Sequence, residues 1–300
     1  MAEPTPIETI LWRGVEVHIK RDDLNHPIVQ GNKQHKLKHN LNKARKQGAD
    51  TLVTFGGAYS NHLVATAYMA KKNGYKVIGI VRGDELKHAE AHWSDTLKHC
   101  RHLDMQLEFV SRADYRQKQH SHAAQAILSA LDAAYIIPEG GSNAAAVLGV
   151  AEWLQSVKTQ LNTAPSHIIC PVGTGGTLAG IIMGSAQNHW HCQLIGVAVL
   201  KGLQGVNSDI NQWLKQTMQT TDGCPDWTIS SDYCGSGYAK LTPEMKQFAV
   251  SFKAQYGIGL DKIYNVKSFY ALDCLIKKGQ ISSGHQPLII HTGGLQGGIL

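Results

Sequence analysis

One lysine, Lys33, stands where an amine could do chemistry on an aldehyde. It belongs to the stretch GNKQHKLKHNL at 31–41, which follows an extended segment, Val15–Asp23, and opens a helix. The helix dipole is positive at this end, so a buried ammonium is disfavoured there and its pKa falls from about 10.4. A neutral amine is the form that makes a Schiff base. The alternative is a solvated lysine in a lysine-rich helix, and the neighbouring motifs must decide between the two.

A second motif, a glycine turn, offers a place for an anion. It consists of Gly173, Thr174, Gly175, Gly176 and Thr177. Because it follows an apolar run and opens a helix, its N–H groups and the helix dipole form an anion cradle. A dinucleotide fingerprint needs glycine where Leu178 stands, and the Gly-Lys-Ser/Thr of a P-loop is also absent. The motif therefore favours a single phosphate, with a tight turn that binds no ligand as the alternative.

Strand-like apolar runs alternate with helical ones, which predicts parallel sheets covered by helices on both faces. The expected strands are Thr51–Phe55, Lys76–Val81, Gln106–Val110, Tyr135–Pro138, His167–Val172, Gln193–Leu200, Trp227–Asp232, Lys262–Asn265 and Pro287–His291. The expected later helices are Asn61–Lys72, Glu85–Cys100, Ala123–Ala133, Asn143–Leu161 and Leu178–Asn188. Glycine turns follow four strands, at 56–57, 140–141, 173–176 and 293–294. Ligands bind at the carboxyl ends of parallel strands, so these turns are candidate walls of one site.

Length and composition narrow the class of protein. The 300 residues suggest two lobes, and a hydrophobic content of 43% allows a sizeable core. The six cysteines are scattered without a CxxC pair, and no signal peptide or long apolar run is apparent, so we expect a cytoplasmic protein outside the membrane. The net charge of +6 is spread along the chain, which argues against nucleic acid as the partner but suits an anionic cofactor.

Histidines raise the question of a metal site. On a helix spanning 85–100, His88, His92 and His99 would share one face, and histidines four residues apart can bind zinc. No carboxylate or cysteine completes a convincing ligand set. We therefore expect a solvated face and no metal.

Taken in order, the motifs resemble one family. They are Gly31-Asn32-Lys33, Phe55-Gly56-Gly57 with Ser60-Asn61-His62, the turn at 173–177, and His291-Thr292-Gly293-Gly294, supported by Lys20–Leu24 and Leu260–Asn265. They are similar to the pyridoxal-phosphate enzymes of the tryptophan-synthase-β-like fold (fold type II). The nearest group is the D-cysteine desulfhydrase / 1-aminocyclopropane-1-carboxylate (ACC) deaminase family. The resemblance implies an α/β fold of two lobes, each with a mostly parallel sheet covered by helices. It also implies a large cofactor-binding domain (1–42 plus 155–300), a small domain (43–154) and a homodimer.

The same resemblance implies a role for each site residue. Lys33 would attach covalently to pyridoxal 5′-phosphate and act as the base at the substrate α-carbon. Asn61 would donate to the cofactor's 3′ oxygen, the turn at 173–177 would hold the phosphate, and Thr292 would meet the pyridine nitrogen. The substrate-binding set would be Ser60, Asn61, His62, Tyr238 and Tyr264, with Ser60 and Tyr264 also catalytic.

Two positions depart from the family pattern. Arginine is usual where His35 stands, and glutamate or threonine where Asn265 stands. Asparagine cannot change its protonation state, which counts against opening of the ACC ring. We therefore expect a lyase that performs α,β-elimination on D-cysteine or a related small amino acid, giving pyruvate, ammonia and sulfide. The alternatives are an ACC deaminase, which would be classed as a hydrolase, and a non-catalytic pyridoxal-phosphate or amino-acid-binding protein.

Overall fold

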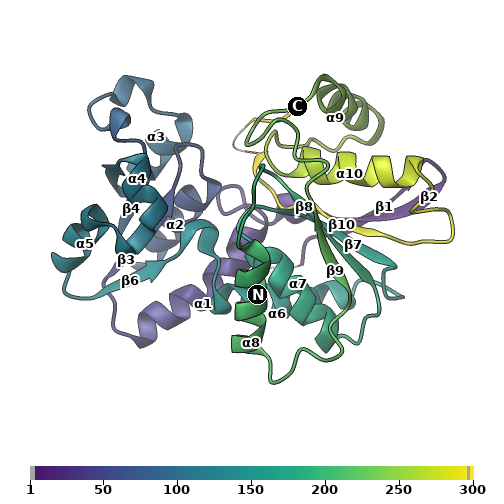
Figure 1. Ribbon diagram of the computed structural model, residues 1–300, viewed down its shortest axis with the longest axis horizontal. Helices are drawn as coiled ribbons and strands as arrows, with labels where there is room; N and C mark the ends of the chain where they lie inside the picture. The colour runs from purple at the N-terminus through teal and green to yellow at the C-terminus, as the bar shows by residue number, and fades with distance from the viewer. Residues whose placement is uncertain (1–3, 296–297) are drawn as a thin grey trace.

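Two sheets of largely parallel strands form two lobes (Figure 1). The computed structural model describes residues 4–295 and 298–300. The larger sheet has the order β1-β2-β10-β7-β8-β9 and the smaller has the order β5-β4-β3-β6. Only β1 runs antiparallel to its neighbour. The strands are β1 (Ile7–Trp12), β2 (Val15–Lys20), β3 (Thr51–Gly56), β4 (Lys76–Arg82), β5 (Gln106–Val110), β6 (Ala134–Ile137), β7 (His167–Val172), β8 (Gln193–Ala198), β9 (Trp227–Ser230) and β10 (Leu288–Ile290).

Helices cover both faces of each sheet, because the central strands are apolar on both sides. In the large lobe one core cluster joins the sheet to α6, α7 and α8, and a second joins it to α9 and α10. In the small lobe the two clusters use α1, α2 and α3 on one face and α4 and α5 on the other. The helices are α1 (Asn32–Lys46), α2 (Asn61–Asn73), α3 (Asp95–His102), α4 (Arg112–Gln117), α5 (His122–Ser129), α6 (Ala144–Lys158), α7 (Gly176–Gln187), α8 (Val206–Thr217), α9 (Pro243–Tyr256) and α10 (Asn265–Lys277).

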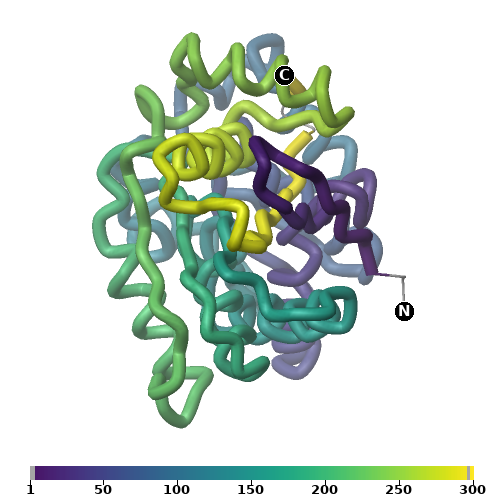
Figure 2. The backbone as a smooth tube through the Cα atoms, turned by 90° about the vertical axis from the view of Figure 1, so that its right-hand side faces the viewer, coloured from purple at the N-terminus to yellow at the C-terminus, as the bar shows by residue number. Residues whose placement is uncertain are grey.

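The N-terminal and C-terminal parts of the chain meet in the large sheet. Strand β10 lies between β2 and β7 and pairs in parallel with both. Figure 2 shows the N-terminal hairpin of β1 and β2, in purple, beside the C-terminal segments in yellow. The expected α/β fold of two lobes, with parallel sheets covered by helices, is therefore confirmed.

The expected helix over 85–100 is wrong. Short 3-10 turns occupy 84–86 and 90–92, and α3 begins only at Asp95. The hydroxyl of Ser94 caps this helix by accepting from the N–H of Leu97, and the indole of Trp93 donates to the carbonyl of Leu86 at 2.9 Å. His88, His92 and His99 therefore do not share one helix face. In the described part of the chain no group of three or more His, Cys, Asp or Glu side chains is arranged to hold a metal.

The expected strand over Lys262–Asn265 is also wrong. The carboxylate of Asp261 accepts hydrogen bonds from the N–H groups of Ile263, Tyr264 and Asn265, at 2.8–2.9 Å, which bends this segment into a turn and starts α10. The sequence analysis also missed β1, α4, α8, α9 and α10. A search of the helices over the described residues finds none long and apolar enough to cross a membrane.

The domain boundaries expected at 42/43 and 154/155 stay a prediction. Residue 42 lies inside α1 and residue 154 inside α6, and these two helices pack against each other. The apolar side chains of α1, including Leu37 and Leu41, join the core of the small lobe, whereas those of α6 join the core of the large lobe. The start of α1 is consequently held by both lobes.

Candidate active site

A cavity of about 390 Å³ lies where the glycine turns of both lobes meet. Its walls include the turns that follow β3 and β7, the segment after β6 and the segment after β10. All of the site residues expected from the sequence line it, with the exception of Gly176: Lys33, Ser60, Asn61, His62, Gly173, Thr174, Gly175, Thr177, Tyr238, Tyr264 and Thr292. Residues more than 250 positions apart in the chain are thus brought together.

Lys33 is the second residue of α1 and projects into this cavity. The backbone just before it is fixed by Gly31, which has φ +62; a Cβ there would lie 1.8 Å from the carbonyl oxygen of Thr292. The Lys33 ammonium donates to Oδ1 of Asn32 at 2.7 Å. Burial lowers the pKa of Lys33 to about 8, although the carboxylate of Asp261 acts in the opposite direction. Lys33 therefore has a substantial neutral fraction near neutral pH.

The anion cradle expected at 173–177 joins β7 to the 12-residue helix α7. Gly175 has φ +82, a backbone conformation that favours glycine. The first N–H groups of α7 and the positive end of its dipole lie at the end of the helix that meets the cavity. The amide of Asn32 donates to the hydroxyl of Thr177 at 2.6 Å, so the cradle is tied to the helix that carries Lys33. A Cβ on Gly175 would contact Ile210 at 3.1 Å rather than the cavity.

A second buried lysine, Lys36, was missed by the sequence analysis. Its ammonium donates to the hydroxyl of Ser142 at 2.7 Å, and that hydroxyl lies 2.6 Å from the hydroxyl of Thr174 in the cradle. Burial and the neighbouring Lys33 lower the pKa of Lys36 well below its usual value. A bound phosphate would supply the negative charge that this lysine lacks. The signal was present in the sequence, because Lys36 follows Lys33 by three residues and so lies on the same side of α1.

The start of α2 forms the opposite wall. Ser60 occupies the N-cap position without a side-chain cap bond, so the first N–H groups of the helix remain available to a carboxylate. His62 is buried, and its Nε2 lies 2.7 Å from the hydroxyl of Thr54, which itself donates to the carbonyl of Ile137. The single hydroxyl hydrogen is thereby used, so Nε2 of His62 is assigned as the donor. Burial, together with two nearby lysines, lowers the pKa of His62 well below its usual value and keeps the ring neutral.

Two tyrosines complete the wall near Lys33. The ring centroid of Tyr264 lies 5.9 Å from the Lys33 ammonium nitrogen. Burial and the neighbouring Tyr238 and Asp261 raise the pKa of Tyr264 well above its usual value, so the phenol stays protonated. Tyr238 comes from the loop before α9, is 36% exposed, and hydrogen-bonds with Tyr264. The pair therefore places phenol groups between the reactive amine and solvent.

Asn265 does not lie where the sequence analysis expected it. Its side chain is fully buried behind Thr292 and is absent from the cavity wall. The amide donates to Asp261 and to the carbonyl of Gly293, both at 2.6 Å, and its oxygen accepts from the N–H of Thr292 at 2.9 Å and from the Thr292 hydroxyl at 3.3 Å. Asn265 thus positions the segment that carries Thr292 instead of facing a ligand.

His35, the other departure, also has a structural role. Its Nε2 lies 2.8 Å from the buried carboxylate of Asp22, and its ring stacks on Trp153 with the centroids 5.1 Å apart. Asp22 belongs to the segment between β2 and α1, and Trp153 belongs to α6. His35 therefore connects three segments that hold the start of α1 in place.

The donor set fits a phosphate-bearing aldehyde. Lys33 supplies an amine of lowered pKa, the turn at 173–177 supplies N–H groups and hydroxyls, and Lys36 supplies a buried amine beside them whose charged form a phosphate would stabilise. Pyridoxal phosphate has both required groups, an aldehyde and a phosphate, and the separate N-terminus of α2 leaves room for the carboxylate of an amino acid.

Comparisons with known proteins agree with this site. The profile of the family described as "Pyridoxal-phosphate dependent enzyme" matches residues 2–293. The chain is 31% identical to a D-cysteine desulfhydrase of Klebsiella pneumoniae, covering 97% of this chain and 92% of that protein. It is 30% identical to the mitochondrial bifunctional D-cysteine desulfhydrase/ACC deaminase of Arabidopsis thaliana, covering 98% of this chain and 77% of that protein. A crystal structure of an ACC deaminase homologue superposes with a TM-score of 0.87 at 28% identity, covering 99% of this chain and 91% of that one.

These matches confirm the expected family and cofactor, and they leave the substrate to be determined. The family consists of enzymes, which argues against a non-catalytic binding protein, and the hydrolase classification does not suit it. With the two-lobed parallel fold, the lysine of lowered pKa and the phosphate cradle, the chain belongs to the family of pyridoxal-phosphate-dependent enzymes, in the group that includes ACC deaminases and D-cysteine desulfhydrases.

Proposed function

We propose that this enzyme catalyses α,β-elimination from D-cysteine or a related small amino acid, giving pyruvate, ammonia and sulfide. The observation that carries the proposal is a buried base with a hydrogen-bond donor beside it. Lys33 has a pKa lowered to about 8, and its nitrogen lies 5.9 Å from the ring centroid of Tyr264, whose phenol stays protonated and can donate a hydrogen bond. Elimination needs a base at the α-proton and stabilisation of the charge that develops on the leaving group, and these two side chains would supply both.

Bound pyridoxal phosphate supplies the electron sink that weakens the bonds at the substrate α-carbon. With the cofactor bound, Lys33 would be the base that removes the substrate α-proton. The N–H groups at the start of α2, with Ser60, bind the substrate carboxylate. Tyr264, whose phenol stays protonated, donates a hydrogen bond to the departing sulfur, and Tyr238 shields the site from water. Thr292 would face the pyridine nitrogen with a neutral hydroxyl, which favours elimination over reactions that need a long-lived carbanion.

ACC deamination is the second candidate, because one relative carries both activities in its name. ACC has no α-hydrogen, so its ring must be opened by attack or protonation at a ring carbon. That places a greater demand on acid–base groups beside the substrate than elimination does. Asn265 is hydrogen-bonded and buried away from the cavity, so the tyrosines would have to meet this demand. The raised pKa of Tyr264 makes its phenol a weak proton donor, and we therefore rank D-cysteine above ACC.

A keto-acid release screen tests the proposal. The purified holoenzyme would be supplied with D- and L-cysteine, β-chloroalanine and ACC, and both the keto acid and sulfide would be measured. We expect pyruvate and sulfide in equal amounts from D-cysteine, little product from ACC, and no product in the Lys33→Ala control. General acid–base groups contribute about 10²–10⁴-fold, so the difference between substrates should be clear. Efficient turnover of ACC without elimination from cysteine would overturn the proposal.

The assembly and the location of the enzyme remain our proposals as well. We propose a homodimer in the cytoplasm, acting on a small amino acid. All six cysteines are free thiols, and four of them are buried, which suits a reducing compartment. Size-exclusion chromatography with light scattering would test the dimer, and a monomer at micromolar concentration would contradict it.

A further inference from the structure

Arg82 is a cation in the cavity wall that the proposed reaction does not use. It is the last residue of β4 and lines the cavity at the edge where the parallel strands of the small lobe end. A Cβ built on Gly57 would lie 3.5 Å from its Nη2, so the guanidinium lies against the turn that leads to Ser60. Arg82 is thus a neighbour of the proposed carboxylate site.

Arg82 is an exposed side chain that has no ion-pair partner among the described residues. Within residues 4–295 and 298–300, no carboxylate forms an ion pair with Arg82. Glu139, an acidic residue of the same wall, already accepts from the Tyr115 phenol at 2.5 Å and pairs with the Lys118 ammonium at 2.7 Å. The guanidinium instead lies over the ring of Tyr115, at 5.8 Å from its centroid. Arg82 therefore lines the cavity with its guanidinium open to solvent and available to an anionic ligand.

The position of Arg82 relative to the reactive amine indicates which part of a substrate it would meet. The charge of Arg82 is close enough to Tyr238 to lower the pKa of that phenol, against the larger effect of burial. Tyr238 hydrogen-bonds with Tyr264, whose ring lies 5.9 Å from the Lys33 nitrogen. The wall thus runs from Lys33 through the two tyrosines to Arg82. A substrate held at Lys33 and α2 whose β-substituent lies on the Tyr264 side, as the proposed reaction requires, would extend along this wall toward Arg82.

We propose that Arg82 selects amino acids whose β-substituent bears negative charge or leaves as an anion. This inference rests on the proposed function and specifies its substrate class. In the elimination of D-cysteine, Lys33 takes the α-proton, the Cβ–S bond breaks, and its electron pair stays with sulfur, which leaves as hydrosulfide. A guanidinium beside the sulfur stabilises that charge. A β-carboxylate meets the same guanidinium through two parallel N–H donors.

Aspartate and asparagine form a matched pair of probes, because they have the same shape and differ in the charge of the β-substituent. Each enantiomer would be titrated into the holoenzyme, and binding would be followed by the visible absorbance of the bound cofactor and by calorimetry. We expect aspartate to bind about tenfold more tightly than asparagine, since hydrogen bonds to charged groups are worth roughly that factor or more. In Arg82→Gln the ratio should fall to about one, and Arg82→Lys should retain part of it.

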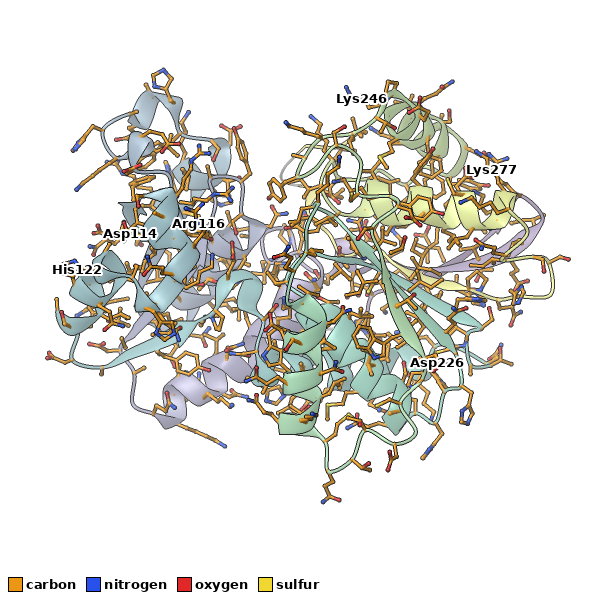
Figure 3. The ribbon with its side chains drawn as sticks, viewed as in Figure 1. Asp114, Arg116, His122, Asp226, Lys246 and Lys277 are labelled. Atoms are coloured by element: carbon orange, nitrogen blue, oxygen red, sulfur yellow. The ribbon has the colours of Figure 1, made fainter. Side chains whose placement is uncertain are left out.

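Arg116→Gln is the control, because it removes the same charge from the small lobe outside the cavity. Arg116 lies on α4, as Figure 3 shows, and is not among the cavity-lining residues. This variant should keep the wild-type ratio. The inference is overturned if Arg82→Gln leaves the ratio unchanged. It is also overturned if that variant weakens both ligands equally, since Arg82 would then bind the carboxylate common to both.

Turnover of D-cysteine, measured in parallel, separates this inference from the proposed function. Pyruvate release without a preference for aspartate would overturn the role of Arg82 and leave the elimination intact. A preference that depends on Arg82, in an enzyme that releases no keto acid from D-cysteine, would support the role of Arg82 and refute the elimination.

Discussion

The lowered pKa of Lys33 predicts how quickly the apoenzyme captures its cofactor at each pH. Only the neutral amine attacks an aldehyde, so the rate should follow the neutral fraction of Lys33. With a pKa of about 8 rather than 10.5, the neutral fraction at pH 7 is about one tenth instead of about one in 3,000. At pH 7 capture should therefore be about 300-fold faster than by a lysine of ordinary pKa at the same place.

The assay is stopped-flow absorbance after apoenzyme is mixed with pyridoxal phosphate between pH 6.5 and 10.5. Because the pKa is lowered, the rate should rise tenfold per pH unit below about pH 8 and become level above it. Borohydride reduction and peptide mapping should place the label on Lys33, and Lys33→Ala should lose it while keeping its fold. A rate that still rises through pH 10, or a label on Lys36 or Lys38, would refute the reasoning.

Three further variants test the residues around the cofactor. Lys36→Met should weaken cofactor affinity about 10- to 100-fold in equilibrium dialysis, because it removes a charged donor beside the cradle, while the apoenzyme melts no earlier than the wild type. Gly176→Ala would place a Cβ 2.6 Å from the Ser142 hydroxyl and should weaken cofactor binding, because it would disturb the hydrogen bond from Lys36 to that hydroxyl. An unchanged cofactor affinity would contradict a role of this hydrogen bond in cofactor binding. Asn265→Ala should lower the free energy of unfolding by about 2–4 kcal/mol in urea titrations, because four hydrogen bonds of a buried amide are lost; a change below about 0.5 kcal/mol would contradict its structural role.

The sequence predicted the strands and glycine turns of the site well, because their signals are local. An apolar run followed by glycine, as at β3 and β7, needs no distant partner to be recognised. The turn at 261–264 was mistaken for a strand because the capping carboxylate of Asp261 satisfies three N–H groups in place of a neighbouring strand, and such a cap has no apolar pattern.

The residues that tune the site were harder to predict, because their roles depend on contacts between distant segments. Lys36 can be recognised as a candidate phosphate partner only from its contact with Ser142, which is 106 positions away in the chain. Asn265 looked like a cavity residue because it follows Tyr264 in the chain. The start of α10 turns its side chain toward Asp261 instead. In the same way, the sequence does not show that Arg82 lines the cavity without a carboxylate partner; only the structure does.

The place of β10 in the large sheet has a consequence for synthesis of the chain. This strand joins β2 to β7, so the sheet stays in two pieces until the segment through residue 290 has left the ribosome. The hairpin of β1 and β2 must wait for partners that are made much later; Trp12, for example, donates a hydrogen bond to Asp273, 261 residues away. Pairings of such long sequence separation form slowly and leave strand edges exposed in the meantime. Nascent chains of this enzyme should therefore depend on chaperones that shield β2 and β7 until β10 arrives.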